Sequence, residues 1–148
     1  GKKGTRIALS LESPPTVAEN RETLIELLNS VDVLFSNEEE LTALGKDIEW
    51  LLQRVRLLYL KRGRRGSTVF TRRKKWEVQS FSRKTVDTTG AGDFYAAGVI
   101  YGLTHGRTPR EAGGIGARMA GKVVEHFGAT IRNITFPREK QSTCLFQR

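Results

Sequence analysis

Short apolar runs alternate with segments of helical periodicity along the first part of the chain, and this alternation constrains the fold strongly. The runs that we interpret as buried strands are residues 7–11, 31–35 and 57–61, and the helical segments between them are residues 20–28 and 48–55. Strands joined through helices lie parallel, with right-handed crossovers. Residues 67–71 and 76–81 read instead as a hairpin. We therefore expect an α/β fold in which a partly parallel sheet is flanked by helices and carries a β-hairpin insertion.

A short helix is expected directly after the second strand. Ser36 and Glu39 have the spacing of a capping box, and Gly45 is placed to end the helix. The acids of its first turn suit the helix dipole, which explains them about as well as a function does. This helix follows a parallel strand, so Asn37 and Glu40 are expected at the carboxyl edge of the sheet, where α/β proteins bind ligands.

The strongest functional signal is residues 86–94, which read Val-Asp-Thr-Thr-Gly-Ala-Gly-Asp-Phe. Gly90 and Gly92 permit a tight turn into a helix, so the N–H groups of residues 91–93 are expected to converge on an anion such as phosphate. Asp93, in the first helical turn, is placed to accept a proton. An anion site and a carboxylate in one turn suit phosphoryl transfer to a hydroxyl. The structural alternative is a capped helix without ligand.

At this Asp-Thr-Thr-Gly-Ala-Gly-Asp run the chain resembles the ribokinase-like (PfkB-type) family of sugar and nucleoside kinases. The resemblance implies that Asp93 is the catalytic base. It also implies that Gly90, Ala91 and Gly92 form the anion hole for the transferred phosphoryl group.

Two other segments resemble the same family in the expected order. Residues 37–40 are similar to its N-x-x-E element, which implies that Asn37 and Glu40 take part in placing magnesium. Residues 61–66 occupy the place of its G-x-x-G loop beside the nucleotide, although two glycines at this spacing also make a simple turn. The residues assigned on this basis to the nucleotide are Lys61, Gly63, Gly66, Thr88, Thr89 and Gly121. The implied cofactors are ATP and Mg²⁺, and a monovalent cation is a further candidate.

The resemblance runs from about Gly4 to Ile131 and covers only the later part of a family member. It implies that residues 1–148 form the C-terminal nucleotide-binding and catalytic part of a ribokinase-like kinase, without the N-terminal acceptor-binding part. We expect ATP-dependent phosphoryl transfer to a hydroxyl of a small sugar. An adenosine-kinase-like nucleoside kinase is the alternative, suggested by Gly116-Ala117 and the turn at residues 13–15. A third possibility is a non-catalytic remnant that binds nucleotide or nucleic acid.

The net charge of +9 raises the question of nucleic acid as a partner. Residues 72–75, a run of Arg and Lys, form one basic cluster. This cluster lies between the two expected strands of the hairpin, so we interpret it as a solvated tip. No nucleic-acid-binding motif accompanies it. We therefore expect no specific nucleic-acid partner.

Glycines are frequent in a long helix expected from Thr108 to Gly128, where Thr108 and Glu111 form a capping signal. Each glycine in a helix interior costs roughly 0.5–1 kcal/mol relative to alanine. Close packing against the preceding helix is the structural explanation, and a nucleotide along this face is the functional one. The glycines concerned are Gly113, Gly114, Gly116 and Gly121.

The remaining composition favours an ordinary intracellular protein. A single cysteine, Cys144, excludes an intrachain disulfide, and no apolar run approaches membrane-spanning length. We expect a cytoplasmic protein without membrane contact, and a homodimer is a candidate assembly.

Overall fold

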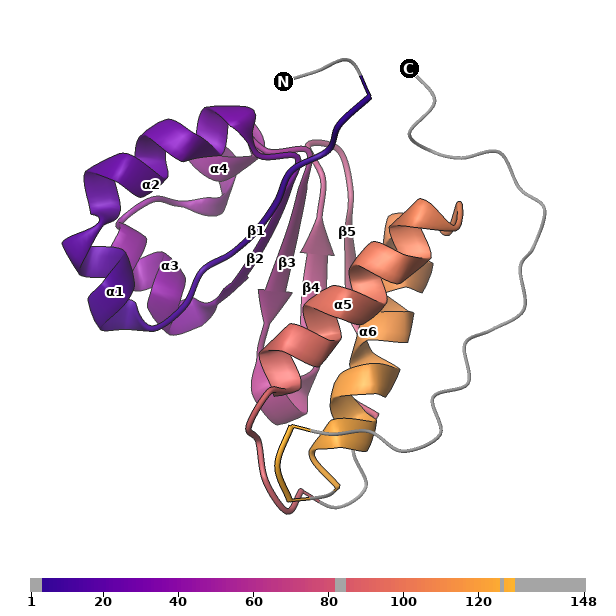
Figure 1. Cartoon of the computed structure of the whole chain (residues 1–148). Helices are drawn as coiled ribbons and strands as arrows, with labels where there is room; N and C mark the ends of the chain where they lie inside the picture. The colour runs from indigo at the N-terminus through magenta and orange to yellow at the C-terminus, as the bar shows by residue number, and fades with distance from the viewer. Residues whose placement is uncertain (1–3, 82–84, 126, 130–148) are drawn as a thin grey trace. The chain divides into compact units, whose positions relative to one another are not determined.

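The computed structural model describes residues 4–81, 85–125 and 127–129 (Figure 1). Cys144 therefore lies outside the described residues. The chain divides into two compact units. Unit 1 consists of Gly1–Arg62 and Thr68–Trp76, and unit 2 consists of Gly63–Ser67 and Glu77–Arg148.

A mixed sheet has five strands in the order β1-β2-β3-β4-β5. The strands are β1 (Ala8–Ser10), β2 (Val33–Asn37), β3 (Leu57–Lys61), β4 (Ser67–Phe70) and β5 (Lys75–Val78). The first three are parallel, with Ala8 paired to Val33 and Val33 to Leu57. This confirms the expected α/β fold. The third strand begins and ends where the sequence predicted, whereas β2 begins two residues later and continues through Asn37.

The helices of unit 1 are short, and three of them begin at a side chain that caps the first turn. They are α1 (Pro14–Glu19), α2 (Arg21–Leu27), the 3₁₀ helix η1 (Leu28–Ser30), α3 (Glu38–Leu44) and α4 (Ile48–Leu52). Ser13 caps α1 and Asp47 caps α4. Asn20 lies at the N-cap position of α2, but its side chain does not cap this helix; the side-chain amide donates instead to the Thr16 carbonyl of the preceding helix at 2.9 Å. The helix predicted to reach residue 55 ends at Leu52.

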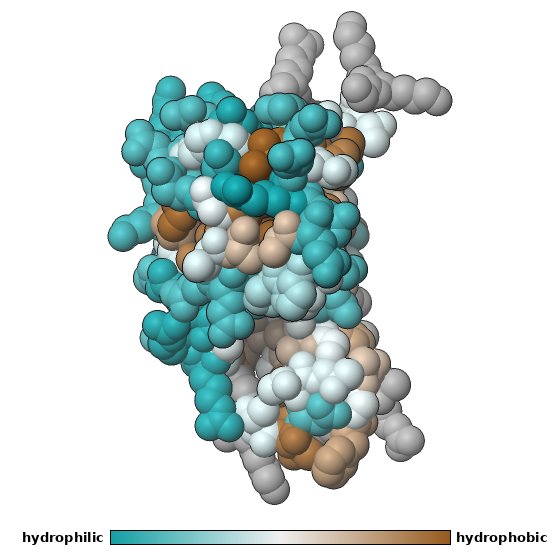
Figure 2. All heavy atoms as spheres, turned by 90° about the vertical axis from the view of Figure 1, so that its left-hand side faces the viewer, coloured by the Kyte–Doolittle hydropathy of each residue, from teal (hydrophilic) through white to brown (hydrophobic). Residues whose placement is uncertain are grey.

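The core of unit 1 is built from leucines on the strands and on the helices that follow them. Leu34, Leu44, Leu51 and Leu58 are fully buried. Strands β2 and β3 are buried along nearly their whole length, which explains their continuous apolar sequence. Leu27, at the end of α2, is half exposed and lies outside this core. In Figure 2, hydrophilic side chains predominate in the upper part of the view, with a few apolar spots among them, whereas white to brown side chains gather in its lower part.

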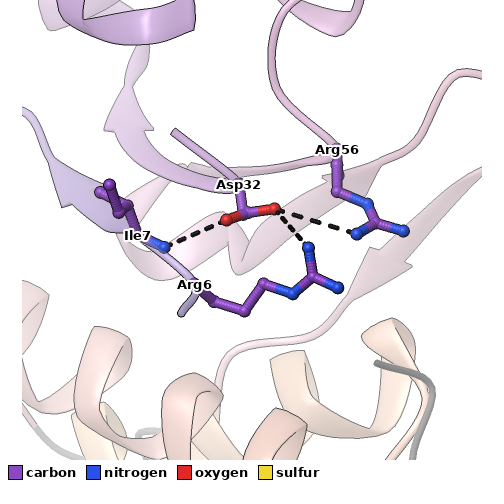
Figure 3. A network of polar contacts seen from close by, with 4 residues as sticks. All are labelled: Arg6, Ile7, Asp32 and Arg56. Carbon is purple, nitrogen blue, oxygen red and sulfur yellow. Dashed lines mark hydrogen bonds and ion pairs between the residues drawn. The ribbon is translucent and has the colours of Figure 1, made fainter. Parts of the chain in front are cut away.

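Asp32 joins the amino-terminal ends of the parallel strands (Figure 3). Its carboxylate accepts a hydrogen bond from the Ile7 backbone N–H at 3.1 Å and pairs with Arg6 at 3.1 Å and with Arg56 at 3.9 Å. The Asp32 carbonyl also accepts the backbone N–H groups of Arg56 and Leu57. One residue therefore holds the start of three strands at the edge opposite to Asn37.

Strands β4 and β5 form the predicted hairpin, and its basic tip is exposed as expected. Thr71 closes the turn by donating its N–H to the Lys74 carbonyl at 2.8 Å. Arg72 differs from the prediction that the side chains of this tip contact only solvent. Its guanidinium donates to the carbonyls of Leu52 and Gln53, both at 2.7 Å, at the end of α4.

Unit 2 contains two long helices, α5 (Ala91–Thr104) and α6 (Pro109–Val123). The predicted capping box of Thr108 and Glu111 is present, but α6 ends at Val123 rather than at Gly128.

Glycines let α5 and α6 approach each other closely. A Cβ atom on Gly98 would lie 2.8 Å from the Gly116 Cα, and one on Gly102 would lie 2.9 Å from the Ala112 Cα. A Cβ on Gly116 would lie 2.6 Å from the Tyr95 carbonyl oxygen. Helix packing therefore explains Gly116, as the structural alternative predicted. Gly114 has no neighbour within 4 Å of the corresponding position.

Candidate functional site

Asn37, Glu40 and Lys61 lie together at the carboxyl edge of the parallel strands in unit 1. Asn37 ends β2 and caps α3, and its register partner on β3 is Lys61. The Asn37 Oδ1 accepts the Glu40 N–H at 2.7 Å, and Glu40 Oε2 accepts the Asn37 N–H at 2.9 Å. The capping box predicted for Ser36 and Glu39 is therefore wrong by one residue. The strand continues through Ser36, so the helix can begin only after Asn37.

Glu40 is a buried carboxylate, with 5% of its surface exposed. Burial raises its pKa, while the Asn37 N–H and the charge of Lys61 act in the opposite direction. The Asn37 side-chain amide adds a hydrogen bond to Oε1 at 2.7 Å. The hydrogen bonds of Asn37 hold both carboxylate oxygens in one orientation at the sheet edge.

This arrangement limits how Asn37 and Glu40 can bind a metal ion. The Asn37 Oδ1 is used by the Glu40 backbone N–H, and the two carboxylate oxygens of Glu40 accept from the backbone N–H and the side-chain amide of Asn37. Each carboxylate oxygen nevertheless retains further acceptor capacity. Across residues 4–81, 85–125 and 127–129, no group of three or more His, Cys, Asp or Glu side chains could hold a metal ion. The pair is suited to orient the water shell of a magnesium ion, which commonly keeps several waters.

The glycine-rich segment in unit 2 forms a tight turn that leads into α5. Gly90 is the N-cap residue and has φ of 76°, which favours glycine, and a Cβ here would lie 2.7 Å from the Ala129 Cβ. The Ala91 N–H donates to the Thr88 carbonyl at 3.1 Å and closes the turn. The expectation that this N–H is free for an anion is therefore not met. Gly92 and Asp93 are the next residues of α5, where backbone N–H groups lack acceptors within the helix.

Asp93 is exposed in the first turn of α5, so its carboxylate is accessible to a ligand. Gly92 has an ordinary helical conformation and is absent from the positive-φ glycines. The backbone therefore does not require glycine at position 92. A close approach by a ligand remains a physical reason for the missing side chain.

Asp87 locks the start of this turn, a role that the sequence analysis did not assign. Its Oδ1 accepts the Thr89 N–H at 2.9 Å and the Thr89 hydroxyl at 2.7 Å, and its Oδ2 accepts the Gly128 N–H at 3.0 Å. The hydrogen bonds from Thr89, and then from Gly128, lower the pKa of Asp87 to about 2. The spacing of Asp87 and Thr89 is typical of an Asx turn and was the available sequence signal. Thr88 and Thr89 themselves are exposed.

The G-x-x-G loop is also part of unit 2 and forms the 3₁₀ helix η2 (Gly63–Arg65). Gly63 and Gly66 both have positive φ, and the Gly66 N–H donates to the Gly63 carbonyl at 3.0 Å. A Cβ on Gly66 would lie 2.1 Å from the Val78 carbonyl oxygen, so only glycine fits there. The turn interpretation is thus correct for Gly66, and it leaves the assignment to nucleotide open.

The predicted site residues fall into two groups, one in each unit. Unit 1 holds Asn37, Glu40 and Lys61 at one strand edge. Unit 2 holds Gly63, Gly66, Thr88, Thr89, residues 90–93 and Gly121, which is buried on α6. Within the described residues, no helix is long and apolar enough to cross a membrane.

Comparisons with known proteins identify the family and the fold of the chain. The pfkB family carbohydrate kinase profile matches residues 3–135. A nucleoside kinase of Methanocaldococcus jannaschii is 35% identical over 114 residues, which are 74% of this chain and 38% of that protein. An ATP-dependent ribose-1-phosphate kinase of Halopiger xanaduensis is 38% identical over 104 residues, covering 66% of this chain and 35% of that protein.

A solved structure extends the similarity to three dimensions. The adenosine kinase from Sinorhizobium meliloti matches 85% of this chain and 41% of that chain, with a TM-score of 0.80 and 32% identity. The chain thus spans less than half of each of these three proteins. The profile covers most of the sequence and the fold matches as well. The chain belongs to the pfkB family of carbohydrate kinases.

Proposed function

We propose that this chain is the nucleotide-binding and catalytic part of a kinase that transfers the terminal phosphoryl group of ATP to a hydroxyl of a small sugar. The observation that carries the proposal is the turn of residues 90–93. There, Gly90 adopts a left-handed backbone conformation at the start of a 14-residue helix, and the exposed carboxylate of Asp93 lies in the first turn of this helix. Helix N–H groups stabilise anionic oxygens, and the carboxylate can take the proton of the attacking hydroxyl.

Each residue of the turn has a distinct role in this proposal. Asp93 accepts the proton of the acceptor hydroxyl while the oxygen of that hydroxyl attacks the terminal phosphorus atom of ATP. The bond between this phosphorus and the bridging oxygen breaks, and ADP leaves. Gly90 sets the entry into the helix, and the N–H groups at the helix start hold the transferred phosphoryl group. Ala91 closes the turn through Thr88. The residues proposed to contact the nucleotide are Lys61, Gly63, Gly66, Thr88, Thr89 and Gly121.

Asn37 and Glu40 are proposed to act on the magnesium ion that accompanies ATP. The buried Glu40 carboxylate keeps acceptor capacity beside the Asn37 amide, and this fits the water shell of Mg²⁺ better than direct ligation. When bound, magnesium neutralises the charge that develops on the phosphate oxygens. The contribution of this chain is to orient water molecules at the sheet edge.

A nucleoside is the second candidate acceptor. The Methanocaldococcus jannaschii nucleoside kinase and the Sinorhizobium meliloti adenosine kinase favour it, while the Halopiger xanaduensis ribose-1-phosphate kinase favours a sugar compound. The sequence argument from Gly116 no longer separates the two, because helix packing already explains that glycine. A panel containing a pentose, a hexose, adenosine and cytidine, assayed for ADP release, decides between them.

Replacing Asp93 with Asn in the full-length protein tests the proposed chemistry. We expect the turnover number to fall by about 10²- to 10⁴-fold, because a general base is lost. The Kd for MgATP should stay close to the wild-type value, because the carboxylate acts on the acceptor. Glu125→Gln, an exposed acid in unit 2, is the matched control. An unchanged turnover number for Asp93→Asn would remove it from the mechanism.

Three further expectations stay predictions. The basic tip should bind DNA and RNA only weakly and lose them steeply with salt, because such binding comes from counterion release. The other two are a cytoplasmic location and a homodimer, both of which stay proposals.

A further inference from the structure

Ser67 and Tyr95 form a buried hydrogen bond that has no place in the function proposed so far. The Ser67 Oγ and the Tyr95 hydroxyl oxygen are 2.7 Å apart, and the residues are 28 positions apart in sequence. Their exposed fractions are 1% and 5%. Burial raises the pKa of Tyr95 to about 12, so the hydroxyl keeps its proton at neutral pH. A phenylalanine would fill the same core without requiring a partner for the hydroxyl.

The two residues adjoin the two segments of unit 2 that are proposed to bind the phosphates and nucleotide. Ser67 directly follows Gly66 and begins β4, and Tyr95 lies two positions after Asp93 on α5. At 3.6 residues per turn, Asp93 and Tyr95 point about 200° apart. Accordingly, Asp93 is exposed and Tyr95 is buried. The tyrosine anchors the inner face of the turn whose outer face presents the carboxylate.

Backbone contacts hold both partners of this bond. The Gly66 backbone is pressed against the end of β5, where a Cβ would lie 2.1 Å from the Val78 carbonyl oxygen. On the other side, the Tyr95 carbonyl packs against Gly116 of α6, where a Cβ would lie 2.6 Å away. The hydrogen bond therefore joins two segments whose backbones are closely packed against neighbouring elements.

We propose that the Ser67–Tyr95 hydrogen bond is a positioning device that fixes the Gly63–Gly66 loop to the helix carrying the Gly90–Asp93 turn. It keeps the nucleotide-binding loop and the anion-binding turn in the arrangement that binds MgATP. Both hydroxyls are buried, so they act through these segments and are positioning residues rather than catalytic ones. This inference rests on the proposed kinase function.

The test uses Ser67→Ala, Tyr95→Phe and the double variant in the full-length protein. Each single variant should raise the Kd for MgATP, measured by calorimetry, by about 2- to 10-fold, the worth of one hydrogen bond. The double variant should show no larger increase than the single variants, because all three lack the same bond. The KM for the acceptor should stay at the wild-type value. Tyr101→Phe removes a hydroxyl from the same helix and should leave the Kd for MgATP unchanged.

The outcomes separate this inference from the proposed function. Wild-type protein that neither binds MgATP nor phosphorylates an acceptor overturns both. If the wild type is active and a folded single variant has an unchanged Kd for MgATP, only the positioning role is overturned. This holds even if the melting temperature of that variant falls. Effects that multiply in the double variant also overturn it, because they show two independent roles. If Tyr95→Phe fails to fold, the Kd for MgATP of Ser67→Ala, compared with the Kd of the wild type and of Tyr101→Phe, decides the question.

Discussion

Gly116 and Gly114 lie two residues apart on α6, yet the structure predicts different effects on stability when each is replaced with alanine. At Gly116 the added methyl group would lie 2.6 Å from the Tyr95 carbonyl oxygen and 2.8 Å from Val99 Cγ2. Carbon atoms essentially never come closer than 3.0 Å in this way, and the first contact is with backbone. At Gly114 nothing lies within 4 Å. Only Gly116→Ala therefore forces α5 and α6 apart.

The two variants share one favourable contribution and differ in one unfavourable one. Alanine in a helix interior is favoured over glycine by about 0.8–1 kcal/mol at both positions. Overpacking between the helices costs roughly 1–3 kcal/mol, and only at Gly116. We expect Gly114→Ala to raise the free energy of unfolding by about 1 kcal/mol. The free energy of unfolding of Gly116→Ala should be about 1–3 kcal/mol lower than that of Gly114→Ala.

Urea unfolding of the full-length protein, followed by circular dichroism, measures this difference. The denaturation midpoints should separate while the m-value stays constant, because the surface exposed on unfolding hardly changes. Since α5 begins at the Gly90–Asp93 turn, Gly116→Ala should also lower the turnover number, whereas Gly114→Ala should not. Equal stabilisation by both variants would refute the close approach of the two helices.

The remaining predictions concern single side chains. Glu40→Gln should raise the magnesium concentration that gives half of the maximal rate. The control Glu111→Gln, which disrupts the same kind of capping box on α6, should not. If the magnesium titrations of the wild type and both variants superimpose, Glu40 acts only as a helix cap. The folded-state pKa of Asp87, about 2, lies below its ordinary value of 3.8. The wild type should therefore be more stable than Asp87→Asn above pH 3.8, and this difference in stability should disappear as the pH falls towards about 2. Thermal melts across this range check it, and a difference that is independent of pH would contradict it. Arg72→Ala should lower the free energy of unfolding by about 1 kcal/mol, because two carbonyls at the end of α4 lose their donor, whereas the exposed neighbour variant Arg73→Ala should change it little. Equal urea midpoints for these two variants would show that the contact is not stabilising.

Strand β3 and the capping box of α6 were predicted at the right residues, because each depends on a pattern within a few neighbouring positions. The cap of α3 was predicted one residue too early. Both Ser36-x-x-Glu39 and Asn37-x-x-Glu40 satisfy the capping pattern, so local chemistry could not choose between them. The register of β2 against β3, which pairs Asn37 with Lys61, decided it by extending the strand.

The sequence by itself determined the α/β class, the family and the turn before α5, because apolar periodicity, caps and glycine conformations act over short stretches of chain. Only the tertiary structure decided which groups from distant segments meet. It joined Asp87 to Gly128, placed Ser67 against Tyr95, and distinguished Gly116 from Gly114. These contacts depend on distances between elements far apart in sequence, and no periodicity or local spacing encodes such distances.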